Sequence, residues 1–95
     1  MGQNATCSWH DEKREIVFRS RGIDFADLEA FFRDSQAIVR LDDRRDYGEQ
    51  RFNMLAREFG VVLNITFTPR AGRYHLISAR IANRKEREIY AEAKR

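Results

Sequence analysis

The stretch Val61-Val-Leu-Asn-Ile-Thr-Phe-Thr-Pro-Arg-Ala-Gly-Arg-Tyr-His-Leu-Ile-Ser-Ala-Arg80 decides the fold. Its first part, Val61 to Phe67, is almost fully apolar, and Tyr74 to Arg80 alternates along the chain, so that Tyr74, Leu76, Ser78 and Arg80 share one face. Both patterns are typical of β-strands, and Pro69-Arg-Ala-Gly72 between them is typical of a turn. The sequence therefore predicts two antiparallel strands here.

Two more strands are predicted upstream. Ile38 to Leu41 is a short apolar run, and residues 49–56 alternate between polar and apolar side chains. The turn residues Glu58-Phe-Gly60 connect the second of these runs to Val61. We expect a four-stranded antiparallel meander.

Helical spacing marks both ends of the chain. Asp11 can cap a first helix that ends at Gly22, and Asp24 can cap a second. The second helix would bury a face formed by Phe25, Leu28, Phe31 and Phe32, at steps of three and four residues. Asn83 and Glu86 predict a capping box for a closing helix. The expected fold is α+β, with two N-terminal helices and a C-terminal helix around the sheet.

Composition bounds the function. A chain of 95 residues forms one domain, and its apolar runs are too short for a membrane helix. One cysteine and two histidines offer no zinc-binding spacing, so we expect no metal, no cofactor and a cytoplasmic location. Residues 1–8 are expected to be a flexible leader, and residues 9–95 a single domain.

Positive charge gathers at the C-terminal end. Residues 1–69 carry 10 basic and 12 acidic side chains, whereas residues 70–95 carry 8 basic and 3 acidic ones. This asymmetry suits a polyanion or an acidic protein partner, although a solvated helix face would have the same composition.

Arg80, at the end of the last strand, is the first candidate site residue. Its planar guanidinium matches a phosphate and stays charged at any working pH. An ion pair with Glu86 is the alternative, purely structural reading.

A second cluster lies between residues 42 and 51, where Tyr47, Glu49 and Arg51 follow one another closely. Together with Arg80 these residues would supply the parts for cleaving an RNA phosphodiester. A base frees the ribose 2′-hydroxyl, cations stabilise the charge on phosphorus, and an acid protonates the leaving oxygen, without a metal.

The chain also resembles a known family. Trp9 with Lys13 and Gly22-Ile-x-Phe25, then Tyr47-Gly-Glu-x-Arg51, then Ile77-Ser-Ala-Arg80-x-Ala82 with Glu86-Arg87-x-x-Tyr90, resemble the BrnT toxins of bacterial type II toxin-antitoxin pairs. The resemblance implies a RelE-like fold and an endoribonuclease that inhibits translation. It also implies a BrnA-like antitoxin that binds DNA, masks the toxin and brings it to operon DNA.

Carried over by position, the resemblance makes Arg80, Glu49, Arg51 and Tyr90 the catalytic candidates. Arg45, Tyr47, Arg84, Lys85 and Arg87 are the expected RNA-binding residues. Many family members carry Lys-His where Ser20-Arg21 stands here, and His-Ser where Arg45-Asp46 stands. These departures leave arginine, glutamate and tyrosine side chains for the chemistry. A non-catalytic RNA-binding module and a protein-interaction domain remain as alternatives.

Overall fold

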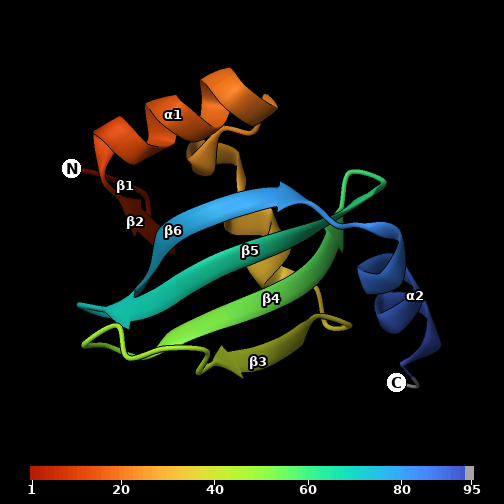
Figure 1. The fold of residues 1–95 in the computed structure, drawn as a ribbon. Coiled ribbons are helices and arrows are strands. Elements are labelled where there is room, and N and C mark those ends of the chain that lie inside the picture. Colours follow the sequence, from red (N-terminus) through yellow and green to blue (C-terminus); the bar gives the residue numbers. More distant parts are fainter. Residues whose placement is uncertain (94–95) are drawn as a thin grey trace.

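A six-stranded mixed sheet organises the computed structural model, which describes residues 1–93 (Figure 1). The strands are β1 (Gly2–Gln3), β2 (Cys7–Trp9), β3 (Ile38–Asp42), β4 (Arg51–Glu58), β5 (Val61–Arg70) and β6 (Arg73–Ile81). Their order across the sheet is β1-β2-β6-β5-β4-β3. The predicted meander of β3 to β6 is confirmed, with every neighbouring pair antiparallel.

Two α-helices flank the sheet, as expected at the two ends of the chain. Helix α1 (Asp11–Arg21) contacts β6 and ends at Gly22, whose φ of 70° is the left-handed conformation that glycine adopts readily. Helix α2 (Arg84–Glu92) begins with the predicted capping box, in which Asn83 and Glu86 each bond the other's backbone N–H.

The second N-terminal helix differs from the prediction. In place of one α-helix, the chain forms two short 3₁₀ segments, η1 (Phe25–Asp27) and η2 (Glu29–Arg33). The buried residues Phe25, Leu28 and Phe31 recur at intervals of three, which is the repeat of a 3₁₀-helix. Their spacing therefore fits the tighter helix better than the α-helix that we expected.

The N-terminal residues form strands rather than the flexible leader that we expected. β2 pairs in parallel with β6, and Cys7 is fully buried. Burial raises the pKa of the Cys7 thiol to about 12. β1 then pairs with β2 in antiparallel fashion and adds the outermost strand. The sheet therefore has six strands where four were expected, and the implied RelE-like arrangement does not match in detail.

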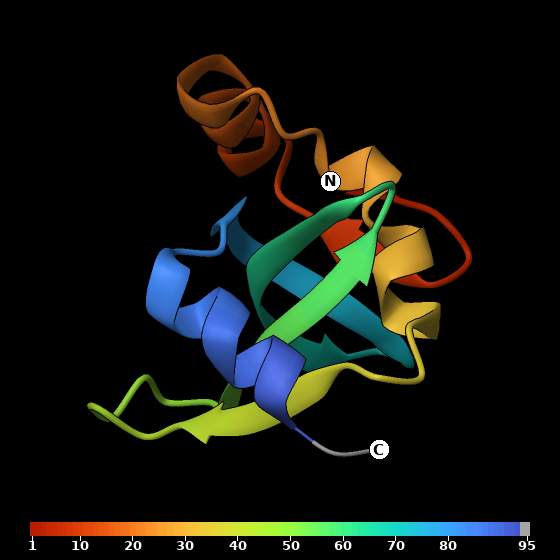
Figure 2. The ribbon, with the colours of Figure 1, turned by 90° about the vertical axis from the view of Figure 1, so that its right-hand side faces the viewer.

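The two faces of the sheet have different surroundings. One face packs its apolar side chains, including Met54, Ile65 and Leu76, against residues of the η segments such as Phe25 and Phe31. Helix α2 covers only one end of the opposite face, through Tyr90 and Ile89. Figure 2 shows the η segments, in gold, and α2, in blue, on opposite sides of the sheet. The remainder of the α2 side forms a cleft, so we name it the cleft face.

A β-bulge in β6 decides which side chains reach the cleft face. The register passes from Thr66 opposite Ser78 to Phe67 opposite Leu76, so Ile77 has no partner of its own on β5. Leu76 and Ala79 consequently both face the core, although they are three positions apart. The predicted alternation across the whole strand was therefore wrong, because the extra residue resets it.

Among residues 1–93, none of the helices has the length and apolar character needed to span a membrane.

Candidate functional site

An open cleft of about 590 Å³ lies on the cleft face, between β3, the end of α1 and the start of α2. Its cationic lining consists of Arg21, Arg40, Arg44, Arg45, Arg51 and Arg80, against the carboxylates of Asp42, Asp43 and Glu86. Asn53, Asn64, Thr66 and Ser78 provide its polar floor. Six guanidinium groups beside three carboxylates give the cleft a positive potential that favours an anionic ligand.

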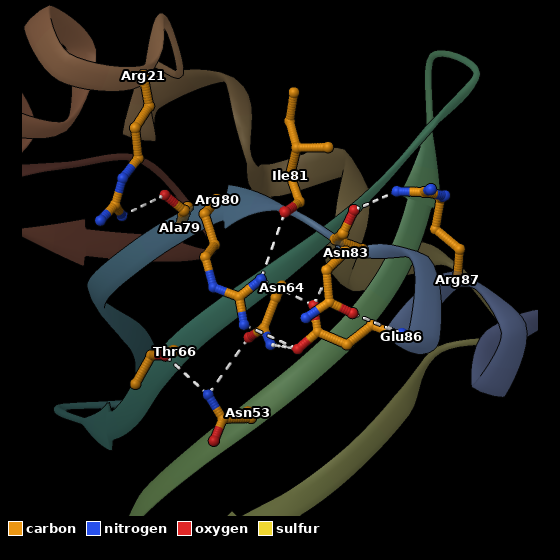
Figure 3. Close-up of polar contacts among 11 residues, drawn as sticks. Arg21, Asn53, Asn64, Thr66, Ala79, Arg80, Ile81, Asn83, Glu86 and Arg87 are labelled. Atoms are coloured by element: carbon orange, nitrogen blue, oxygen red, sulfur yellow. Dashed lines mark hydrogen bonds and ion pairs between the residues drawn. The ribbon is translucent and has the colours of Figure 1, made fainter.

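Arg80 reaches the cleft and is held there by Glu86. Its Nη1 and Nη2 atoms each donate to one oxygen of the Glu86 carboxylate at 2.8 Å (Figure 3). The Arg80 side chain remains 43% exposed. The structural alternative, an ion pair with Glu86, is therefore present, and it coexists with access to the cleft.

Glu86 is fixed from several directions. Besides the Arg80 bonds, its carboxylate accepts from the Asn64 amide at 2.8 Å and from the Asn83 backbone N–H at 3.0 Å. The Arg80 hydrogen bonds are the main reason why the pKa of Glu86 falls to about 2. Within residues 1–93, the Nε atom of Arg80 has no hydrogen-bond acceptor, so the side edge of the guanidinium is open to a ligand.

The polar floor is itself connected by hydrogen bonds. The Asn53 side-chain amide donates to the Thr66 hydroxyl at 2.8 Å and to the side-chain Oδ1 of Asn64 at 3.3 Å. Asn64 then donates to Glu86. The sheet register explains this proximity, because Asn53 pairs with Thr66 across β4 and β5, and Asn64 pairs with Arg80 across β5 and β6. The floor and the Arg80 ion pair therefore form one network.

Arg21 is a cleft residue that the sequence prediction missed. It lies in the last turn of α1, and its Nη1 donates to the Ser78 hydroxyl at 3.1 Å. The same Nη1 donates to the Ala79 carbonyl at 2.9 Å (Figure 3). Neither partner is charged, so the positive charge of Arg21 is not neutralised by an ion pair within residues 1–93. The sequence placed Arg21 just before Gly22, at the end of the first helix, but it gave no sign that this helix end would pack on β6.

The loop after β3 supplies the opposite wall. Asp42 binds Arg44 through two hydrogen bonds of 2.8 and 3.0 Å, which lower the pKa of Asp42 to about 2. The Tyr47 hydroxyl also donates to Asp42, at 3.3 Å. Arg51 stacks over the Tyr47 ring at 4.2 Å, with Arg45 at 5.5 Å. The predicted residues Arg45, Tyr47 and Arg51 are thus brought together.

Glu49 lies outside the residues that line the cleft. It accepts from Arg70 at 2.9 Å and from Arg51 at 3.5 Å. The Arg70 bond is the main reason why the pKa of Glu49 is lowered. Within residues 1–93, the hydrogen bond to Arg51 is what links Glu49 to the cleft lining, and no hydrogen bond or ion pair joins Glu49 to Arg80.

The remaining candidates lie on α2, away from the cleft lining. The Tyr90 hydroxyl donates to Asp34 at 2.7 Å, and the Tyr90 side chain is buried in the small cluster that anchors α2. Arg87 donates to the Ala82 carbonyl at 2.6 Å. Arg84 and Lys85 are exposed on the helix surface.

Histidine is absent from the cleft lining, and grouped metal ligands are absent from residues 1–93. His75 is buried and bonds Ser8, with 3.0 Å between His75 Nδ1 and the Ser8 hydroxyl. Burial is the main cause of its lowered pKa. Across residues 1–93, no three His, Cys, Asp or Glu side chains are placed to hold a metal together.

The structure is that of a small α+β protein with an arginine-lined cleft over its sheet, which suits an anionic ligand. Comparison with known protein families identifies the class of the protein. Residues 9–86 match the family described as the ribonuclease toxin of type II toxin-antitoxin systems, BrnT, so the chain belongs to the BrnT family. The search of curated proteins finds no match to it. Toxins of this class act on RNA and have a protein antitoxin as partner.

Proposed function

We propose that the chain cleaves RNA within the cleft, using arginine side chains to bind the phosphodiester and stabilise its transition state. The observation that carries the proposal is the open side edge of Arg80, held in a 590 Å³ cleft by Glu86. A guanidinium has a second pair of N–H groups beside the pair that a carboxylate occupies, so Arg80 can bind Glu86 and a phosphate together.

In the proposed reaction the ribose 2′-hydroxyl attacks the adjacent phosphorus. The bond from the 2′-oxygen to phosphorus forms while the 2′-hydroxyl proton passes to water in the open cleft. The bond to the 5′-oxygen breaks, and that oxygen takes up a proton from water, which leaves a 2′,3′-cyclic phosphate and a 5′-hydroxyl. Negative charge on the phosphoryl oxygens grows during this step. Arg80 and Arg21 lie on the β6 side of the cleft, and Arg51 and Arg45 lie on the side of the β3–β4 loop. Preorganised cations of this kind contribute roughly 10² to 10³ each to a rate.

Two of the catalytic candidates receive other roles in this proposal. Glu49 holds Arg51 against Tyr47 from outside the cleft, so we assign it a positioning role. Tyr90 anchors α2 through Asp34, and α2 in turn carries Glu86. Arg80 and Arg51 keep the catalytic role because both side chains line the cleft.

A direct experiment separates cleavage from binding. Purified protein is incubated with an end-labelled RNA in the presence of EDTA, and the product ends are identified. The proposal requires new 5′-hydroxyl and 2′,3′-cyclic phosphate ends without added metal. Retention of the RNA with no new ends would favour a non-catalytic RNA-binding module, and a requirement for a divalent ion would overturn the metal-independent mechanism.

We further propose that the antitoxin is BrnA-like, and that it links the toxin to operon DNA. The net positive charge of the cleft lining supports an acidic contact from such a partner. Growth arrest on induction of the toxin, relieved by co-expression of the neighbouring reading frame, tests this partnership. Failure of that frame to restore growth would contradict it.

A further inference from the structure

Strand β3 is the outermost strand at one end of the sheet. It pairs only with β4, through residues 38–42, and the sheet ends there. No backbone hydrogen bond within residues 1–93 reaches its outer side. The opposite edge, β1, has only two residues. Unpaired N–H and C=O groups along an edge strand are a template on which another chain can add a strand.

The side chains of β3 leave this edge poorly protected. Val39 and Leu41 are 50% and 51% exposed. Opposite Met54 and Phe52 in the register, they lie on the core side of the sheet, and Leu41 also borders the cleft. Edge strands are normally protected by proline, bulges or several charges, whereas β3 exposes one charged side chain, Arg40, between these two apolar residues. An added strand would cover both apolar side chains.

We propose that β3 is the docking edge for one extended segment of the antitoxin, which pairs with it as a seventh strand. The proposal concerns the antitoxin that membership of the family implies, and it holds whether or not Arg80 is catalytic. Because side chains alternate along a strand, the segment would present acidic residues on the side of the cleft and apolar residues on the side of Val39 and Leu41.

Charge favours such a segment over a second copy of the toxin. Arg40 is the central residue of β3, and within residues 1–93 it has no ion-pair partner. Antiparallel pairing of two β3 strands about their centres would place Arg40 opposite its own copy, and like charges directly opposite each other destabilise a strand pair. An acidic residue opposite Arg40 would instead form a favourable pair.

The test uses an end-blocked synthetic peptide, Val-Glu-Leu-Glu-Val-Glu-Leu, and isotope-labelled protein observed by nuclear magnetic resonance. We expect the largest amide shifts at residues 38–42. The same peptide with Lys in place of Glu should bind about tenfold more weakly. Two further peptides carry N-methyl groups on alternate residues, one on the odd and one on the even positions. The peptide in which the methyl groups replace the N–H donors that would face β3 should lose at least about tenfold in affinity.

A matched protein variant completes the test. Val39→Lys should weaken peptide binding about fivefold. It should leave RNA cleavage within about twofold, because Val39 is not among the residues that line the cleft. Should this variant fail to fold, the N-methylated peptides still decide the question with the wild-type protein. Equal binding of both N-methylated peptides, or shifts centred on Arg80, would overturn strand addition at β3. A wild-type dimer that Val39→Lys disperses would assign the edge to a second copy instead.

Discussion

Arg80 and Glu86 form a two-bonded ion pair whose hydrogen bonds are both 2.8 Å long, across the junction between the last strand and the last helix. The pair joins the sheet, which carries the arginine, to α2, which carries the carboxylate. Since Glu86 also completes the capping box of α2, one side chain both starts the helix and orients the arginine. The position of α2 is thereby coupled to the geometry of the cleft.

The ion pair between Arg80 and Glu86 makes the free energy of unfolding depend on pH. The folded pKa of Glu86, about 2, lies below the ordinary 4.5, so the pair stabilises the fold above about pH 4.5 and loses this effect as the pH falls towards 2. At pH 7 we expect Glu86→Gln to lower the free energy of unfolding by about 1–2 kcal/mol, since the partly exposed Arg80 is screened by solvent. Urea denaturation at pH 7 and pH 2.5 measures the change.

Glu88→Gln is the matched control, because the one ion pair that Glu88 forms within residues 1–93 is long and exposed, with Arg84 at 3.9 Å. It should change the free energy of unfolding by less than about 0.5 kcal/mol at either pH. A destabilisation by Glu86→Gln that is equal at both pH values would contradict the assigned ion pair.

Glu49→Gln distinguishes a positioning role from a general base. The substitution weakens the hold on Arg51 and Arg70 but leaves Arg80 in place. We expect cleavage to fall by about twofold to tenfold, whereas loss of a general base costs about 10² to 10⁴. Initial rates with a defined RNA measure this. Arg51→Ala should reduce the rate more than Glu49→Gln does, and the reverse order would place Glu49 in the chemistry.

Tyr90→Phe tests the anchoring role of the tyrosine. Removing the hydroxyl leaves Asp34 without this donor, and we expect a loss of about 1 kcal/mol in the free energy of unfolding. Below the unfolding temperature, cleavage should stay within about twofold of wild type. A drop in rate beyond about a hundredfold in a protein of unchanged stability would show that Tyr90 takes part in the reaction.

Gly2→Ala tests whether the N-terminus belongs to the fold. A methyl group at this position would meet the Trp9 indole, so the strand or the ring must move. We expect a loss of about 1–3 kcal/mol in the free energy of unfolding. Trp9 is the sole tryptophan, so its fluorescence follows the change directly. Ala5→Ser, at an exposed position, should have no effect, and an equally silent Gly2→Ala would indicate a free leader.

Local sequence patterns predicted most of the helices and strands, because the formation of each of these elements depends mainly on residues that are close in sequence. The apolar run from Val61 to Phe67 and the turn residues after it were sufficient to predict the hairpin of β5 and β6. The capping pair of Asn83 and Glu86 was sufficient to predict α2. The parallel pairing of Cys7 with Tyr74 was not predictable, since it joins segments far apart in the sequence and the segment is only three residues long. The bulge at Ile77 was also missed, because no glycine or proline marks it.

The site was predicted in part for the same reason. Arg45, Tyr47 and Arg51 lie close in sequence and do meet, and Arg80 does reach the cleft. Arg21 joins Arg80 only through the packing of α1 against β6, which no local pattern reveals. The full lining of the cleft therefore depends on tertiary contacts, which the local sequence patterns do not reveal.

The most direct measurement is the cleavage rate of Arg80→Ala and Arg80→Lys beside Arg84→Ala, an exposed arginine of α2 outside the cleft lining. We predict a loss of about 10² to 10³ for Arg80→Ala, and a smaller loss for Arg80→Lys, which keeps the charge without the planar fork. Arg84→Ala should stay within about threefold of wild type. Wild-type cleavage by a folded Arg80→Ala variant would contradict the central claim that this guanidinium receives the scissile phosphate.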